Sequence, residues 1–151
     1  MSKEDFIQLM KKIVSDAKHL KDTFTEEVNA SVNYACIFCQ DEAEFDEFSG
    51  MAKEIGNIFD ETPTGPLYKI KPIDTDSGQL KLLKIRHPDE TRTERGDADF
   101  TVKDYPSFKA KYLSESGFKL IKRADGEMLE LTAPNATIRV YFSEHPLDKN
   151  L

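Results

Sequence analysis

Apolar residues recur with two different periods along this chain. In residues 3–22 they recur every three or four positions, with lysine and acidic residues between them, which predicts an amphipathic helix. Ser2 followed by Asp5 resembles a capping box at the start of this helix. Such a helix covers either the domain's own core or a second copy of the chain in a homodimer. The apolar stripe consists of Phe6, Leu9, Met10, Ile13, Ala17 and Leu20.

The first half of the remaining chain alternates between strand and helix patterns. Residues 28–40 are rich in β-branched and aromatic residues and predict a strand. Residues 41–59 carry apolar positions at helical spacing, which predicts a helix over most of this stretch. A short strand is expected near its end, at Ile58. Two apolar runs, residues 66–73 and 79–88, flank the turn-forming stretch DTDSG and predict a hairpin. The order is therefore β-α-β-β-β.

The second half repeats this order without visible sequence identity. Residues 97–102 predict a strand, and residues 103–115 predict a helix. Three more strand patterns follow at residues 118–123, 127–133 and 138–144, separated by turn-forming residues. The chain is thus expected to be an α+β protein made of one helix and two β-α-β-β-β units.

This paired order resembles the vicinal oxygen chelate superfamily, the glyoxalase-like and bleomycin-resistance-like fold. The second unit, which begins GDADFTVKDYPSFKAKYLSE, carries the resemblance best. The resemblance implies one compact domain: residues 28–88 and 96–147 form two modules of a curved mixed sheet around a groove, and residues 1–24 add an N-terminal helix. It implies a lyase, isomerase or dioxygenase acting on a small oxygenated molecule, or alternatively a non-catalytic small-molecule-binding module that has lost its metal site.

The resemblance also implies positions for a divalent metal. In such proteins the first and last strands of each module supply His and Glu ligands, and these positions fall here near Asn33, residues 85–87, Asp97 and Tyr141. Asparagine is neutral, and a phenol ionises only near pH 10. Only His87 and Asp97 are ordinary metal ligands, so the implied ligand set is incomplete.

Strand alternation gathers polar residues toward the groove. In residues 97–102, every second side chain is apolar and is expected to face the helices, which turns the polar ones toward the groove. Arg139 in that groove either pairs with a carboxylate or clamps an anionic substrate. The residues expected to bind substrate are Asn33, Asp99, Thr101, Arg139 and Tyr141.

The stretch RHPDETRTERGDADFTV, residues 86–102, joins the two modules. Asp97 and Asp99 near its end either bind a cation or share a proton, or else they lie on a solvated strand or pair with Arg86, Arg92 or Arg95. His87 near its start is either a ligand or an acid–base group, or else belongs to a plain turn. Chemistry at this joint depends on whether His87 and Asp97 point into the same groove.

Charge and composition limit the classes of partner that this protein is expected to bind. The formal charge is −7 and the pI is about 5.0, which argues against non-specific nucleic-acid binding. Eleven acidic residues and one lysine lie between Asp22 and Glu61; they form either a solvated helix face or a docking surface. The sequence shows no membrane span or signal peptide, so we expect a cytoplasmic protein with reduced cysteines.

The pair Cys36 and Cys39 has the Cys-x-x-Cys form. In a strand, residues three apart point to opposite faces, so the two sulfurs diverge. We therefore interpret both as small buried apolar residues and not as a redox or zinc pair.

Overall fold

The computed structural model describes residues 1–124 and 126–145, which form one mixed sheet flanked by helices. The strand order is β2-β3-β4-β1-β5-β8-β7-β6. The elements are α1 Lys3–Phe24, β1 Val32–Phe38, α2 Glu42–Ile55, β2 Gly56–Thr62, β3 Gly65–Thr75, β4 Gly78–Arg86, β5 Gly96–Thr101, α3 Tyr105–Tyr112, β6 Phe118–Arg123, β7 Gly126–Leu131 and β8 Ile138–Ser143. This confirms the predicted α+β class.

The two halves are built alike. In each half the first strand runs parallel to the last one, β1 beside β4 and β5 beside β8, and the other neighbouring strands are antiparallel. The halves join where β1 and β5 pair in antiparallel orientation at the middle of the sheet. The last residues of the expected second module, 146 and 147, lie outside the described residues.

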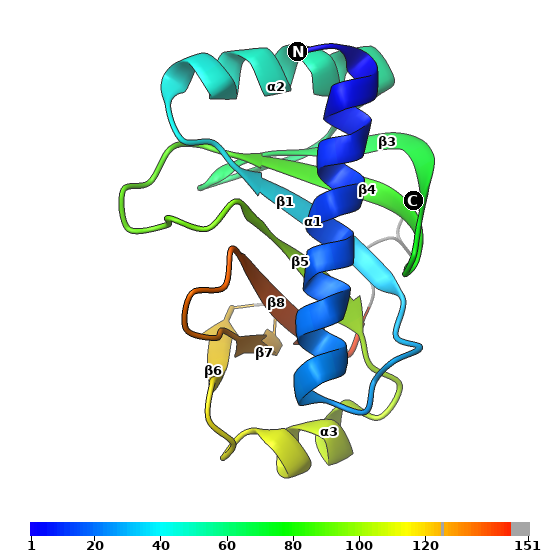
Figure 1. The fold of residues 1–151 in the computed structure, drawn as a ribbon, viewed down its shortest axis with the longest axis vertical. Coiled ribbons are helices and arrows are strands. Elements are labelled where there is room, and N and C mark those ends of the chain that lie inside the picture. The colour runs from blue at the N-terminus through cyan, green and yellow to red at the C-terminus, as the bar shows by residue number, and fades with distance from the viewer. Residues whose placement is uncertain (125, 146–151) are drawn as a thin grey trace.

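Helix α1 lies over the protein's own core, and most of its predicted apolar stripe is buried there. Figure 1 shows α1 lying across the strands, with α2 and α3 toward opposite ends of the sheet. The expected capping box at Ser2 and Asp5 is present. The stripe residues Phe6, Met10, Ile13 and Ala17 are at most 2% exposed, so burial of each large side chain contributes about 1.5–3 kcal/mol. Leu9 and Leu20 of the stripe are partly buried against the same core.

All three helices contribute to the same buried core, which we call the helix-covered side of the sheet. The strand residues in that core include Ala35, Ile37, Ala98 and Phe100. The alternate residues of the same strands therefore point to the other side, which we call the helix-free face. None of the helices in the described part of the chain is long and apolar enough to cross a membrane.

The predicted orientation of β1 is wrong in two respects. Simple alternation along residues 32–39 groups Val32 with Tyr34 on one face and turns Ala35, with Asn33, toward the groove. The structure has a β-bulge between Val32 and Tyr34, so Val32 joins Ala35 in the helix-covered core. Asn33 is the extra residue of this bulge, which sequence alternation does not anticipate.

The two cysteines have the surroundings that the sequence suggested. Cys36 and Cys39 are both buried, and they form no disulfide with each other. Only Cys39 belongs to the helix-covered core. Burial raises the pKa of the Cys39 thiol to about 12 and that of Cys36 well above its usual range. Both thiols stay protonated and unreactive at neutral pH.

Candidate functional site

Two carboxyl side chains lie at the centre of the helix-free face. Asp97 and Asp99 stand on β5, between β1 and β8. Their neighbours on β1 are Cys36 and Tyr34, respectively. The strand starts at Gly96, where a Cβ would lie 2.2 Å from the Cys36 carbonyl oxygen, so only glycine lets β5 approach β1 this closely.

Burial dominates the chemistry of this pair. Asp97 is 6% exposed and Asp99 is 1% exposed. Burial raises the pKa of Asp97 to about 7 and that of Asp99 to about 8, although nearby cations oppose the first shift and a Ser143 hydrogen bond opposes the second. Ser143 Oγ donates to Asp99 Oδ1 over 2.7 Å. Asp97 Oδ1 has no hydrogen-bond partner among the described residues.

Four cationic side chains act electrostatically on Asp97. They lower its pKa against the effect of burial, and they come from three separate segments of the chain. Their charges therefore act on the carboxyl at the centre of the helix-free face from other parts of the sheet and from the linker. They are Lys84 and Arg86 on β4, Arg92 in the linker between β4 and β5, and Arg123 at the end of β6.

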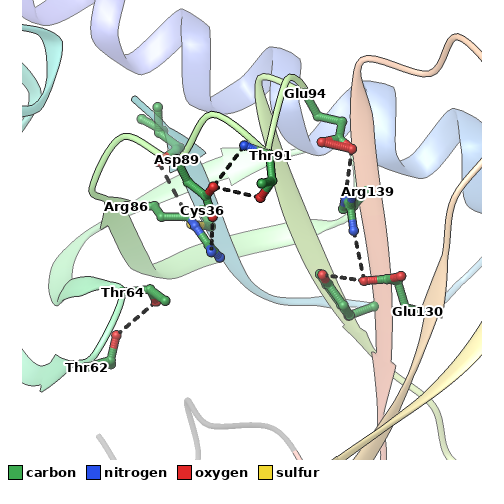
Figure 2. Close-up of polar contacts among 11 residues, drawn as sticks. Cys36, Thr62, Thr64, Arg86, Asp89, Thr91, Glu94, Glu130 and Arg139 are labelled. Atoms are coloured by element: carbon green, nitrogen blue, oxygen red, sulfur yellow. Dashed lines mark hydrogen bonds and ion pairs between the residues drawn. The ribbon is translucent and has the colours of Figure 1, made fainter. Parts of the chain in front are cut away.

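Arg139 is held between two carboxylates. Its Nε donates to Glu94 over 2.7 Å and its Nη1 to Glu130 over 3.2 Å, as Figure 2 shows. Tyr141 donates its hydroxyl hydrogen to the same Glu130 oxygen over 2.8 Å. Burial, helped by Asp97, raises the pKa of Tyr141 far above its usual value. Of the two alternatives for Arg139, the structure shows carboxylate pairing, and Tyr141 is a neutral hydrogen-bond donor.

The linker of residues 87–95 is fixed at both ends. Asp89 accepts hydrogen bonds from the backbone and hydroxyl of Thr91 and pairs with Arg86 over 3.2 Å (Figure 2). At the other end, Arg95 forms two 2.8 Å bonds with the Glu44 carboxylate on α2. These contacts order the linker, and the second one ties its end to α2.

Unpartnered buried polar atoms concentrate in this same stretch. Among the described residues, Arg86 Nε, Arg92 Nη1, Glu94 Oε1 and Asp97 Oδ1 are buried and have no hydrogen-bond partner. Each such atom costs about 1–3 kcal/mol unless something else satisfies it. Native proteins keep few of these groups, so four of them within twelve residues of sequence make this stretch a candidate site.

His87 lies apart from Asp97. Its exposed ring stacks on Phe45 of α2, with ring centroids 4.0 Å apart, and its backbone N–H donates to the Thr64 carbonyl. Since α2 packs on the helix-covered side, His87 does not point into the region that Asp97 faces. The two predicted metal ligands are therefore not brought together.

The residues on the helix-free face do not fit a metal site of the glyoxalase type. Over residues 1–124 and 126–145 there is no group of three or more His, Cys, Asp or Glu side chains that could hold a metal ion. The groups that interact electrostatically with Asp97 include arginines, a lysine and phenols with raised pKa values. Metal ions require deprotonated, electron-donating ligands, and this set supplies cations instead.

The remaining predicted residues take different places. Asn33 sits in the bulge and is 2% exposed, while Tyr34 and Cys36 take the places directly across from the carboxyls. Thr101 instead lines a pocket of about 540 Å³ with Ser31 and other residues, which Asp97 and Arg139 do not line.

Sequence reasoning missed Glu94 and Tyr34 as site residues, and it considered Arg92 only as a possible partner of Asp97 or Asp99. Arg92 and Glu94 belong to a linker, where pattern reasoning assigns no direction to a side chain. The only available signal was the density of charged residues in 86–97, immediately before a buried strand. Tyr34 was missed because of the bulge.

Comparisons with known proteins give the fold and little more. No family model matches the chain, and a search of curated proteins finds no match. A solved structure titled "Structural Genomics, Protein EC4020" is 13% identical, with a TM-score of 0.73 over 97% of this chain and 89% of that one. At this identity the likeness shows a shared fold alone.

Two more distant matches have titles that name an activity class. A glyoxalase/bleomycin resistance protein/dioxygenase superfamily member from Vibrio splendidus 12B01 is 9% identical, with a TM-score of 0.44 over 75% of this chain and 96% of that one. A mutant of 4-hydroxymandelate synthase from Streptomyces coelicolor is 14% identical, with a TM-score of 0.33 over 76% of this chain and 48% of that one. These scores carry no argument about function.

Proposed function

We propose that this chain is a glyoxalase-like protein of the vicinal oxygen chelate type that binds a small polar molecule on its helix-free face without a metal. One observation carries the proposal: four buried polar atoms of residues 86–97 have no hydrogen-bond partner among the described residues. A ligand that supplied those partners would remove their desolvation cost, and that gain would drive binding.

The surroundings support a pre-formed site. Arg95 and Asp89 fix the two ends of the linker, and the Glu94–Arg139–Glu130 network fixes its inner side. Little ordering is then required when a ligand arrives, which favours affinity. Small-molecule sites generally orient their ligand with a small number of precisely placed polar groups.

A second candidate function is proton transfer in a lyase or isomerase reaction. The observation that favours it is the pKa of Asp97 of about 7, because a general acid or base works best when its pKa is near the operating pH. In that case Asp97 would take a proton from a bound substrate through its unpartnered Oδ1. Dioxygenase chemistry finds no support in these residues, since the metal donor set does not fit.

The experiment is a ligand screen with matched variants. Calorimetry and thermal shift would be run against small carboxylates, amines, amino acids, sugars and inorganic phosphate. We expect at least one class to bind, and Arg92→Gln to weaken that binding at least tenfold. Lys53→Gln, an exposed lysine on α2, is the control and should leave it unchanged. If no class binds, or if Arg92→Gln has no effect, the proposed site is wrong.

The same screen separates binding from catalysis. Each bound compound would be incubated with the protein in D2O and followed by proton NMR. A binding module leaves carbon-bound protons unexchanged. If carbon-bound protons exchange with deuterium in the unmutated protein but not in Asp97→Asn, the proton-transfer alternative replaces the binding proposal.

A further inference from the structure

The unpartnered atoms of residues 86–97 are of two opposite kinds. Arg86 Nε and Arg92 Nη1 are buried donors, and Glu94 Oε1 and Asp97 Oδ1 are buried carboxyl oxygens. An arginine N–H can only donate, and an ionised carboxylate can only accept. A partner that satisfies all four must therefore offer acceptors to the arginines and donors to the acids.

We infer that the ligand is a small zwitterion of the α-amino acid class, whose carboxylate meets Arg86 and Arg92 and whose ammonium group meets Glu94 and Asp97. This inference rests on the proposed binding site and specifies its ligand. A planar carboxylate matches the forked donors of a guanidinium, and an ammonium group supplies three donors in a compact space.

The balance of charge argues against simpler ligands. A purely anionic ligand would leave the Glu94 and Asp97 oxygens unpartnered, and it would lie beside the Glu130 carboxylate, which is 8% exposed. Placing like charges together in a buried site is costly, as is leaving a buried charge unpaired.

A purely cationic ligand has the opposite fault. It would leave Arg86 Nε and Arg92 Nη1 unpartnered, and the four cations that act on Asp97 would repel it. An uncharged sugar could offer donors and acceptors, but it would place no charge opposite either set of ionised groups. Charge-assisted hydrogen bonds are roughly twice as strong as neutral ones, so the zwitterion is favoured.

The network around Arg139 explains why one oxygen of Glu94 remains available to a ligand. Arg139 already occupies Glu94 Oε2 and Glu130 Oε2, and this leaves Glu94 Oε1 as the free oxygen of that carboxylate. Figure 2 shows Glu94 on the linker above Arg139, on the opposite side of it from Glu130. Arg139 thus acts as a positioning residue that holds Glu94 in place without contacting the ligand.

The test compares complete amino acids with their two halves on the unmutated protein. Isothermal calorimetry would be run with each proteinogenic L-amino acid, with the carboxylic acid that lacks its amino group, and with the amine that lacks its carboxylate. For alanine these probes are propanoate and ethylamine. We expect at least one amino acid to bind, and both of its halves to bind at least tenfold more weakly.

Variants then assign each half of the ligand. Asp97→Asn and Glu94→Gln should weaken the amino acid at least fivefold and leave the weak binding of its carboxylate half unchanged. Arg92→Gln should weaken both. Circular dichroism and Tm verify that each variant is folded, and the comparison of ligands on the unmutated protein stands even if a variant is not.

The outcomes separate this inference from the proposed function. If a carboxylate half, inorganic phosphate or a sugar binds as tightly as any amino acid and depends on Arg92, the ligand class is wrong and the proposed site survives. If no compound binds at all, both fail, and the unpartnered atoms are satisfied by water.

Discussion

The two sides of strand β5 are almost equally buried and chemically opposite. Ala98 and Phe100 on the helix-covered side are fully buried among apolar residues, and Asp97 and Asp99 on the helix-free face are 6% and 1% exposed. Burial on the first side stabilises the fold through the hydrophobic effect. On the second side burial keeps carboxyls out of water, which costs stability.

The comparison shows where function is to be sought. Nothing in the packing of the sheet requires ionisable groups at positions 97 and 99, because their neighbours at 98 and 100 already supply the core. Buried polar groups lower the stability of the fold, and their presence is most readily explained by a site that uses them.

The largest expected effect comes from the helix-covered side. Phe100→Ala removes a fully buried ring and leaves a cavity, so the free energy of unfolding should fall by about 3–5 kcal/mol. Urea denaturation measures this loss, with Lys103→Ala, an exposed position two residues past β5, as the control. A loss below 1 kcal/mol would mean that this side of β5 does not form the core.

Next comes the network on the helix-free face. Arg139→Met leaves the Glu94 and Glu130 carboxylates without their shared cation, at 14% and 11% side-chain exposure. Unfolding free energy should fall by about 1–3 kcal/mol, because the orphaned acids keep most of their desolvation cost. Lys12→Met is the matched control: its pair with Asp16 is exposed, so the expected change is below about 0.5 kcal/mol. Equal losses for both variants would remove the distinction between a buried and a surface network.

The order of the elements could be predicted from the sequence. Helical spacing located α1 and its capping box, and alternation gave the two-sided character of β5, because both periods follow directly from backbone geometry. The paired β-α-β-β-β order was likewise visible before any contact was known.

The site was less predictable, for reasons that particular residues illustrate. One bulge at Asn33 changed which side chains of β1 accompany Asp97 and Asp99. Arg92 and Glu94 lie in a linker whose direction is set by distant contacts such as Arg95 with Glu44. His87 was a reasonable ligand by type, but its stacking on Phe45 depends on where α2 packs.

A pH series tests the cost of the buried acids. Asp97 and Asp99 hold their protons to about pH 7 and pH 8 in the folded protein, and to about pH 4 when unfolded. The folded state therefore binds more protons across that window, and stability falls as pH rises from about 4 to 8. The Asp97→Asn/Asp99→Asn variant should lack this component, so its free energy of unfolding should rise relative to that of the unmutated protein as the pH increases from about 4 to 8.

The readout is urea denaturation at several pH values. At pH 4 both carboxyls are neutral in the folded state, so the variant and the unmutated protein should differ little. Parallel curves for the two proteins from pH 4 to 8 would contradict raised pKa values at these positions.

The smallest expected effect concerns His87, and it decides between a stacking role and a metal role. Because its exposed ring stacks on Phe45, His87→Ala should cost about 0.5 kcal/mol, the low end for aromatic pairs. Phe45→Ala combined with His87→Ala should cost less than the sum of the two single changes, since the two rings contact each other. Tm would be measured with and without added Mn²⁺ or Zn²⁺. A metal-induced rise in Tm that disappears in both His87→Ala and Asp97→Asn would mean that the two side chains bind the same metal ion. His87 and Asp97 would then not lie on opposite sides of the sheet.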